Sequence, residues 1–372
     1  MRVLHVYRTF FPDTQGGLEE TIRQLCLTTG TLGVESRVLT LSERPEPREV
    51  VVNGIPVVRA KQDFEIASCG FSRAVLGEFA ALSAWADVIH FHFPWPFADV
   101  LDLLGRCRKP KLVTYHSDIV RQRFFGAVYR PLMHHFLSSM DRIVCTSGNY
   151  ARSSTVLNRH ADKVEAIPIG IDERTYPAPA AAGVGTALDA PYFLFVGVFR
   201  YYKGLHVLLD AMREAPYRLL LAGSGPEADA LRAQLKRLRL DNVEFLGYVD
   251  DAAKVALLTH SMAVVLPSIA RSEAFGVSLV EGTMYGRPLV ATEVGTGTSF
   301  VCVDGENGLV VKPGCAQSLR GALDTLHGDA ALRDRFGRAS RKRYEALFTG
   351  ARMGERYRDL YADLLSGRRG PC

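Results

Sequence analysis

Two carboxylates, Glu273 and Glu281, lie in the stretch of the chain whose residue types most clearly suggest chemistry. They belong to SIARSEAFGVSLVEGTMYG, residues 268–286, between an apolar strand predicted over 262–266 and a small-residue helix predicted from about Gly276. In an α/β sheet, the loop after a strand and the start of the next helix form the crevice in which ligands bind. N–H groups at a helix start favour an anion. Two acidic side chains in this position indicate recognition of hydroxyl groups next to a phosphate, the combination found in a sugar nucleotide.

Basic and glycine residues at two other strand ends suggest contacts with phosphate. Arg200 and Lys203 follow an apolar strand predicted over 192–196, where cations would neutralise a pyrophosphate leaving group. Gly16 and Gly17 separate the first predicted strand from the first predicted helix, and glycines let backbone N–H groups approach a phosphate. Each feature also has a purely structural explanation. The glutamates could complement a helix dipole, the basic pair could be a solvated face, and the two glycines could form an ordinary turn.

Histidine residues end one predicted strand and alternate along another. His116 follows the strand predicted over 111–115, where a ring nitrogen can hydrogen-bond a sugar hydroxyl or stabilise developing charge, unless it only bonds the next loop. His90 and His92 alternate along a buried strand and therefore face the same side. Since neither a cysteine nor a third histidine stands at ligand spacing, we interpret both as crevice-lining or core residues and predict no metal site.

The composition favours a soluble, two-domain protein. The chain has 372 residues, 47% hydrophobic and 23% charged, which is too long for one ordinary core. Its seven cysteines include no C-x2-C pair, which argues against a disulfide scaffold and favours a reducing cytoplasm. The N-terminus is predicted to form a strand rather than a signal peptide, and no apolar run approaches the roughly 20 residues that cross a bilayer. The net charge of +5 is modest, and we expect no nucleic-acid partner.

The order of predicted elements divides the chain in two. Strand and helix signals alternate on both sides of a segment rich in Pro, Ala and Gly, residues 176–191. Such alternation predicts two α/β domains with parallel sheets, joined by this linker. We place the domains at residues 1–175 and 176–349.

Charge is distributed unevenly in the first domain. Residues 100–160 contain ten Lys and Arg against three Asp. Within this region Arg121, Arg123 and Arg130 alternate with bulky apolar residues up to Phe136. A basic helix with an apolar stripe can lie on an anionic membrane surface. The alternative is that the stripe packs into the domain and the arginines are only solvated.

Taken together and in order, these motifs resemble those of the retaining GT-B glycosyltransferases of family four. The resemblance rests on the E-x7-E spacing with the Gly-Arg-Pro that ends its helix, the glycine loop at 16–17, TYHSD at 114–118 and Lys203. It covers nearly the whole chain. It implies an α/β fold of two Rossmann-like, doubly wound domains that face a central cleft, with a terminal helix at about 350–372 that returns to the first domain.

The resemblance also implies roles for residues in a metal-independent, retaining reaction without a cofactor. Glu281 would bind the ribose, Glu273 would bind hydroxyls of the donor sugar, and His116 would lie near the reaction centre. The donor phosphate itself would take the acceptor proton. The implied catalytic residues are His116, Glu273, Lys203 and Arg200, and the implied acceptor-binding residues are Asp118 and His92. The implied donor-binding residues are Gly16, Gly17, Gly197, Lys203, Gly247, Tyr248, Val249, Glu273, Phe275, Gly276, Val277 and Glu281.

The chain departs from the family pattern at two positions. Val198 stands where relatives usually carry Arg, so Arg200 is the candidate to supply the missing charge, whereas Lys203 matches in place. Ile169 stands where many relatives have Asn, and the contribution of that side chain is therefore absent.

Further strings indicate a narrower group. FEIAS at 64–68, HFPWP at 92–96, YHSDIV at 115–120 and RYYKG at 200–204 resemble bacterial transferases that build mannan or D-rhamnan O-polysaccharide on a lipid carrier. This resemblance implies GDP-mannose or GDP-D-rhamnose as donor and a polyprenyl-diphosphate-linked saccharide as acceptor. It implies a cytoplasmic protein, peripheral at the inner face of the bacterial inner membrane. Two other classes stay open: a GT-B isomerase of the sugar-nucleotide 2-epimerase type, and a non-catalytic nucleotide-sugar-binding protein.

Overall fold

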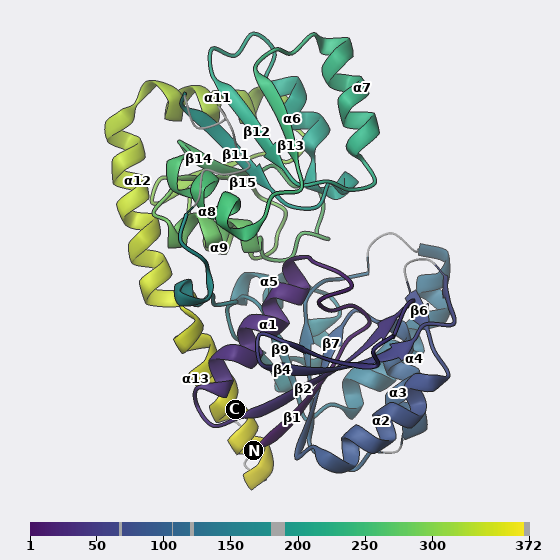
Figure 1. Cartoon of the computed structure of the whole chain (residues 1–372). Helices are drawn as coiled ribbons and strands as arrows, with labels where there is room; N and C mark the ends of the chain where they lie inside the picture. The colour runs from purple at the N-terminus through teal and green to yellow at the C-terminus, as the bar shows by residue number, and fades with distance from the viewer. Residues whose placement is uncertain (67–68, 106, 120–122, 180–189, 368–372) are drawn as a thin grey trace. The chain divides into compact units, whose positions relative to one another are not determined.

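The chain forms two compact units (Figure 1). The computed structural model describes residues 1–66, 69–105, 107–119, 123–179 and 190–367. Unit 1 comprises Met1–Gly170 and Gly350–Cys372, and unit 2 comprises Ile171–Thr349. The boundary predicted at residue 175 therefore lies a few residues further along the chain than the observed one. Most of the predicted linker lies outside the described residues, as does Arg121.

An eight-stranded sheet forms the centre of unit 1. Its order is β10-β9-β8-β7-β1-β2-β4-β3, and neighbours are parallel except β3 and β4. Parallel strands covered on both faces are apolar along their length, and β1, β7 and β8 are almost completely buried. The strands are β1 (Arg2–Val6), β2 (Glu35–Ser42), β3 (Glu49–Val52), β4 (Ile55–Lys61), β7 (Val88–Phe93), β8 (Lys111–Tyr115), β9 (Arg142–Cys145) and β10 (Val164–Ala166), with a separate antiparallel pair of β5 (Phe64–Ile66) and β6 (Cys69–Phe71).

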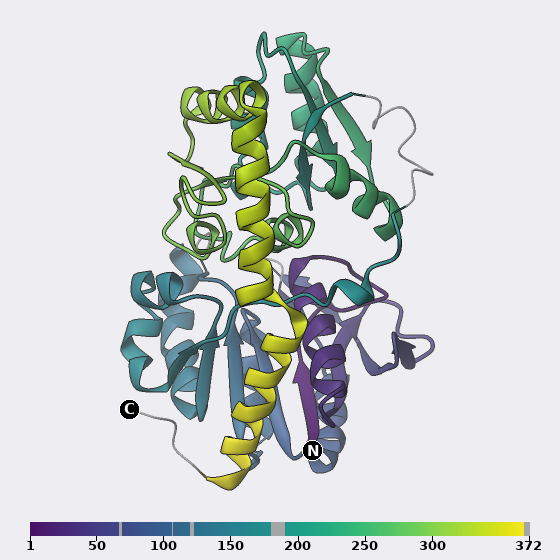
Figure 2. The same ribbon diagram turned by 90° about the vertical axis from the view of Figure 1, so that its left-hand side faces the viewer.

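Helices cover both faces of this sheet. Helices α1 and α13 pack together on one face, and α2, α3 and α4 lie on the other (Figure 1). Figure 2 shows α13 along the face of unit 1 that is turned toward the viewer. Its buried residues join those of β1 and α1 in one core, which contains Val3, Leu25, Val34, Val88, Leu112, Val144, Ile167, Met353, Tyr357, Leu360 and Tyr361. The helices are α1 (Gly17–Gly30), α2 (Ala74–Trp85), α3 (Pro96–Gly105), α4 (Arg123–Ser139), α5 (Gly148–Ser153), η1 (Leu157–Lys163) and α13 (Gly350–Ser366).

Unit 2 is built around a six-stranded parallel sheet of order β13-β12-β11-β14-β15-β16. Helix α6 packs against α7 and α11, and α9 packs against α12. The strands are β11 (Tyr192–Val196), β12 (Arg218–Ala222), β13 (Val243–Gly247), β14 (Ala263–Leu266), β15 (Leu289–Thr292) and β16 (Gly308–Val311). The helices are η2 (Glu173–Thr175), η4 (Tyr201–Lys203), α6 (Leu205–Ala211), α7 (Ala228–Leu238), α8 (Asp251–His260), α9 (Val277–Met284), α10 (Thr298–Val301), α11 (Ala316–Gly328), α12 (Ala330–Arg343) and η5 (Tyr344–Phe348).

Both units are doubly wound, as the sequence predicted. The strand order reverses between β1 and β7 in unit 1 and between β11 and β14 in unit 2. Ligands of open parallel sheets bind outside the carboxyl ends of the strands at such a reversal. The loops that follow these four strands are therefore the places where a site is expected.

The basic segment of the first domain is partly a packing element. Within α4, Met133 and Phe136 are buried in unit 1, whereas Arg130 is exposed. Part of the predicted apolar stripe therefore faces the interior of the unit. Over the described ranges, no helix combines the length and the apolar character needed to cross a membrane.

Helix α13 approaches α1 closely at Gly354, where a Cβ would lie 3.0 Å from the Cβ of Thr28. We expect Gly354→Leu to destabilise unit 1 by about 1–3 kcal/mol because of overpacking. The matched control is Gly321→Leu in α11, where nothing lies within 4 Å of such a Cβ, and a gain of up to about 1 kcal/mol is expected from helix propensity. Urea unfolding measures both changes, by fluorescence of Trp85 and Trp95 for unit 1 and by circular dichroism for unit 2. Equal effects of the two substitutions would contradict this account of the α1–α13 contact.

Candidate active site

An ion pair between Lys203 and Glu273 lies at the strand-order reversal of unit 2. Lys203 Nζ is 2.6 Å from Glu273 Oε2, and the two side chains are 14% and 10% exposed. Burial is the largest single influence on the Lys203 amine and lowers its pKa. The charge and hydrogen bond of Glu273, together with Tyr202, more than compensate, so the pKa is raised overall. Lys203 is therefore a stable ammonium group, held beside a carboxylate where the loops after β11 and β14 meet.

Gly204 allows these two loops to approach each other. Its φ of 68° lies in the left-handed region, and a Cβ here would come 2.2 Å from the carbonyl oxygen of Pro267. The N–H of Ile269 donates to the carbonyl of Tyr202 at 2.7 Å, which fixes one loop to the other. Any side chain at residue 204 would push the two loops, and the ion pair between them, apart.

Arg200 supports Lys203 through its backbone. Its N–H donates to the carbonyl of Val198 at 2.9 Å, and its own carbonyl accepts from the N–H of Lys203 at 3.0 Å. The Arg200 side chain is exposed. The structure thus brings Lys203 to Glu273, while the guanidinium predicted to assist it lies at the surface of unit 2.

Helix α9 begins shortly after Glu273, with Gly276 as its N-cap at a φ of 87°. The N–H groups of a first helical turn have no partner within the helix, which suits Gly276 and Val277 to the predicted contact with an anion. The Phe275 side chain is 2% exposed and packs against Phe300 and Phe348. Only the backbone of Phe275 can therefore serve the donor.

The Glu281 carboxylate is buried in α9 and already has two partners. Its Oε1 accepts from the Tyr176 hydroxyl at 2.8 Å and lies 3.0 Å from Lys254 Nζ. The Lys254 ammonium also stands 4.7 Å from the centre of the Tyr176 ring. Sequence reasoning missed both Tyr176 and Lys254. The sequence feature that could have indicated this contact is that Lys254 lies on α8, the helix that follows the Gly247 loop. A ribose bound to Glu281 would share or displace these bonds.

The remaining residues predicted to bind the donor lie on loops at the carboxyl ends of β11 and β13. Gly197 and Gly247 have positive φ values of 145° and 70°. The carbonyl of Gly247 accepts from the N–H of Gly223 at 2.7 Å, which joins the loops after β12 and β13. Tyr248 is 73% exposed and Val249 is half-buried beside it, so both are accessible to a ligand.

In unit 1, the Gly16-Gly17 turn begins α1. The carbonyl of Gly16 accepts from the N–H of Glu20 at 2.9 Å. The Glu19 carboxylate accepts from the Thr14 hydroxyl at 2.9 Å, and a Cβ on Gly16 would lie 2.8 Å from its other oxygen. An anion here would meet a negative charge as well as N–H groups, so the turn suits a phosphate less well than the sequence predicted.

Three buried histidines form a hydrogen-bonded row in unit 1. His116 follows β8 and is 7% exposed, and its Nε2 lies 3.0 Å from His92 Nδ1. His92 Nε2 lies 3.2 Å from His5 Nδ1. Burial lowers the pKa of His5 and of His116 to about 3, and it lowers the pKa of His92 well below its usual value. The three rings are therefore neutral.

The predicted contact of His92 with an acceptor needs correction. His92 is 1% exposed, and both of its ring nitrogens are bonded to other histidines. It can therefore act on a ligand only through His116.

The spacing of residues along the sequence did not reveal that a third histidine, His5, lies beside His90 and His92. Strand β1 pairs with β7 and sets His5 opposite His90, so that ring nitrogens of the three residues lie within 4.8 Å of one another. Both nitrogens of His90, however, are hydrogen-bonded, to Tyr361 at 2.8 Å and to Thr114 at 2.7 Å. A metal ion at this cluster would have to replace bonds that these rings already make.

Asp118, predicted to orient the acceptor, is firmly anchored. Its Oδ1 accepts from the Tyr115 hydroxyl at 3.0 Å and from the Ser154 hydroxyl at 2.9 Å. A carboxylate fixed by two donors keeps one orientation, which a residue that positions a ligand requires.

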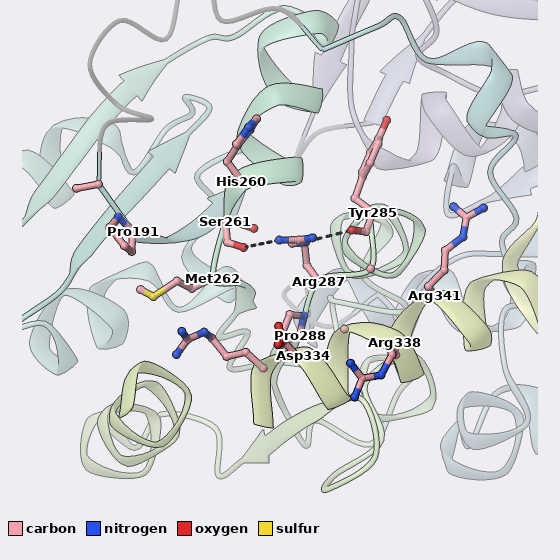
Figure 3. Close-up of a pocket in the computed structure, with 14 residues that line it drawn as sticks. Pro191, His260, Ser261, Met262, Tyr285, Arg287, Pro288, Asp334, Arg338 and Arg341 are labelled. Carbon is pink, nitrogen blue, oxygen red and sulfur yellow. Dashed lines mark hydrogen bonds between the residues drawn. The ribbon is translucent and has the colours of Figure 1, made fainter. Parts of the chain in front are cut away.

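A hollow of about 670 Å³ in unit 2 lies away from all these residues. It is found at the amino ends of β11, β14 and β15, the edge of the sheet opposite to the ion pair. Figure 3 shows Arg287 at its centre, where the guanidinium donates to the carbonyls of Ser261 and Tyr285 at 3.3 and 3.0 Å. Since no predicted site residue lines this hollow, the candidate site is defined by the strand-end contacts instead.

Known proteins resemble this chain along its whole length. The family described as Glycosyltransferase Family 4 matches residues 15–175, and that described as Glycosyl transferases group 1 matches residues 182–343. D-rhamnosyltransferase WbpZ of Pseudomonas aeruginosa is 48% identical over 352 residues, 94% of this chain and 92% of that protein. O-antigen chain mannosyltransferase C of Escherichia coli is 40% identical over 370 residues, 99% of this chain and 100% of that protein.

The solved structure of a sucrose-phosphate synthase from Thermosynechococcus elongatus has the same fold. It matches with a TM-score of 0.82 at 23% identity, over 98% of this chain and 99% of that one. Together with two doubly wound units, this likeness defines the GT-B class of glycosyltransferases. The chain belongs to family four of that class, as the sequence predicted.

The buried ion pair makes a specific prediction about stability. Lys203→Met and Glu273→Gln should each lower the free energy of unfolding by about 3–5 kcal/mol, because each leaves the other charge buried without its partner. The free energy of unfolding of the double variant should fall by less than the sum of the losses in the two single variants. Urea unfolding followed by circular dichroism measures the coupling. The control is the exposed pair of Arg232 and Asp229, where we expect no coupling. Additive losses at Lys203 and Glu273 would show that the pair is not energetically coupled.

Proposed function

We propose that the protein is a retaining, metal-independent glycosyltransferase that moves D-rhamnose or mannose from a GDP-sugar to a lipid-linked saccharide in O-polysaccharide synthesis. The observation that carries the proposal is the Lys203–Glu273 pair at the strand-order reversal of unit 2. The names of the relatives at 48% and 40% identity, a D-rhamnosyltransferase and an O-antigen chain mannosyltransferase, support the choice of sugar and product.

The pair suits the departure of a diphosphate. Transfer breaks the bond between C1 of the sugar and the diphosphate oxygen, and it forms a bond between C1 and an acceptor oxygen. Negative charge that develops on the leaving group is best stabilised by a cation already in place in a water-poor site. Lys203, with 14% of its side chain exposed, is such a cation once Glu273 turns to the hydroxyls of the sugar. Before a donor binds, each group keeps the other charged and oriented.

Residues around the pair complete the donor site in this proposal. Glu281 accepts hydrogen bonds from the ribose, in exchange for those it accepts from Tyr176 and Lys254. Arg200, exposed one turn before α6, reaches the diphosphate and replaces the arginine missing at Val198. The N–H groups at the start of α9 bind a phosphate oxygen.

The acceptor proton is assigned to the departing phosphate. His116 is neutral, and its Nε2 is bonded to His92, so it binds the sugar rather than taking a proton through that nitrogen. Asp118 orients the acceptor hydroxyl. The products are GDP and a saccharide lengthened by one sugar, with the anomeric configuration of the donor retained.

A transfer assay tests the proposal. The protein is incubated with GDP-mannose, with GDP-D-rhamnose or with UDP-glucose, each with polyprenyl-diphosphate-linked N-acetylglucosamine. Mass spectrometry should show one added sugar with a GDP donor only, and the product should form equally well with EDTA present. Lys203→Ala should lower kcat/KM by about 10²–10³-fold, the usual cost of losing one group that stabilises developing charge. The control is Lys236→Ala, which changes an exposed lysine on α7 and should leave kcat/KM unchanged.

The same assay separates the alternatives. An epimerised or hydrolysed donor without acceptor would favour the isomerase, and donor binding without any turnover would favour a binding protein. Equal use of the UDP-sugar would contradict the GDP assignment. An inverted anomeric centre, read from the NMR coupling constants of the product, would contradict retention.

We also propose that α4 and the segment before it contact anionic lipid, since the acceptor is membrane-bound and Arg130 is exposed. Arg121, Arg123 and Arg130 changed together to Gln should reduce sedimentation with phosphatidylglycerol vesicles and leave the low binding to phosphatidylcholine unchanged, because the attraction is electrostatic. The matched control changes the exposed residues Arg232, Lys236 and Arg237 of α7. Equal loss in both triple variants would show that net charge, rather than this segment, drives binding.

A further inference from the structure

The row of histidines in unit 1 leads from the interior of the sheet to the predicted reaction centre. It begins at His5 on β1, passes through His92 on β7 and ends at His116 after β8. The exposures of the three residues are 0%, 1% and 7%. Only the last ring is therefore placed to meet a ligand, and the other two can affect chemistry only through it.

The two hydrogen bonds of the row must point in the same direction. Each neutral imidazole carries one N–H and one lone pair, and the three rings are neutral because burial lowers their pKa values. His92 uses both nitrogens in the row, so it donates at one end and accepts at the other. Either every ring has its hydrogen on Nδ1, or every ring has it on Nε2.

The inner end of the row decides between these arrangements. His5 Nε2 is buried and has no hydrogen-bond partner among the described residues. With hydrogens on Nε2, the row would end in an N–H group without an acceptor, and buried orphan N–H groups are rarer than buried orphan acceptors. With hydrogens on Nδ1, the row ends inside the protein in a lone pair only. We therefore infer that the hydrogens are on Nδ1, and this arrangement leaves the Nδ1–H of His116 for a ligand.

His90 lies against the row without joining its hydrogen bonds. Its ring stacks on that of His92, with centres 4.3 Å apart. Both of its nitrogens bond hydroxyl groups, of Tyr361 and Thr114, and Thr114 also bonds the Tyr357 hydroxyl at 2.9 Å. His90 is therefore a suitable control position, because it is as buried as His92 and contacts the row but takes no part in its hydrogen bonds.

We propose that His5 and His92 are positioning residues that fix His116 as its Nδ1–H tautomer, so that it meets the substrate as a hydrogen-bond donor. The recognised group is an oxygen of the donor sugar, and the inference rests on the proposed role of His116 in sugar transfer. It has a consequence for the reaction. The lone pair of His116 is turned toward His92, so this histidine cannot take the acceptor proton.

The direct test is NMR of the wild-type protein with ¹⁵N-labelled histidine, without substrate. Long-range ¹H–¹⁵N correlations report which ring nitrogen carries the hydrogen, and the spectrum of His116→Gln identifies the His116 signals. The expected result is Nδ1–H for His5, His92 and His116. An Nε2–H tautomer at His116, an average of both tautomers, or signals of metal-bound rings with a bound metal found by elemental analysis would each overturn the proposal.

The kinetic test uses His92→Phe, which keeps a ring but removes the hydrogen bond to His116. His116 should then populate both tautomers, and kcat should fall roughly tenfold, equivalent to one lost hydrogen bond. The KM of the donor should stay unchanged because unit 2 still binds the nucleotide. The control, His90→Phe, should leave the tautomer of His116 and kcat as in the wild type. An unchanged kcat in His92→Phe, or equal losses in both variants, would refute the positioning role.

Failure of this inference can be told from failure of the proposed function. The tautomer of His116 is measured without any sugar, so the result does not depend on which donor the enzyme uses. If no sugar is transferred but His116 is the Nδ1–H tautomer, the proposed function fails alone. If transfer occurs and His116 is the Nε2–H tautomer, the positioning role fails alone.

Discussion

Burying two opposite charges side by side is the constraint on which the chemistry of unit 2 depends. Desolvation of Lys203 and Glu273 is costly, and their attraction compensates only if the geometry is good. That geometry requires the loops after β11 and β14 to touch, which a glycine at residue 204 permits. Such a pair adds little net stability compared with apolar residues. The pair stands at the strand-order reversal of unit 2, where ligands of open parallel sheets bind.

The two units differ in the kind of polarity that they offer. Unit 2 carries charges in contact, Lys203 with Glu273 and Lys254 with Glu281. Unit 1 offers neutral imidazoles, together with one carboxylate anchored by hydroxyl groups. Under the proposed function, the charged groups would face the departing diphosphate, and the neutral imidazole of His116 would donate a hydrogen bond to the sugar. Both sets of groups are buried, so the division follows from their partners. The charges of unit 2 face opposite charges, whereas the histidines of the row face other imidazoles, and burial without an opposite charge keeps them neutral.

The structure confirms the predicted position of three candidate residues after the ends of strands. Lys203, Glu273 and His116 each follow a continuous apolar run, and such runs predict buried parallel strands and thus the edge where ligands bind. His5 and Lys254 were missed because their contacts depend on which strands and helices are neighbours. His5 meets His90 only through the pairing of β1 with β7, a register that no local pattern encodes.

Phe275 and His92 show a second limit of sequence reasoning. A motif identifies a residue but not whether its side chain or its backbone is used. Phe275 lies in the predicted motif, yet its ring packs into the core. His92 lies in the predicted string, yet its ring is 1% exposed and stacks on the buried rings of His5 and His116. In both cases the direction of the side chain is set by tertiary packing rather than by neighbours in the sequence.

The return of α13 to unit 1 has a consequence for the order of assembly during translation. Met353, Tyr357, Leu360 and Tyr361 fill the same core as Val3 and Leu25, but the ribosome makes them only after all of Ile171–Thr349. Unit 2 is contiguous and can fold as soon as it emerges, whereas the unit begun first must wait with an apolar groove open to solvent. The nascent N-terminal half therefore exposes part of its core until α13 is made, and such surface is prone to aggregation.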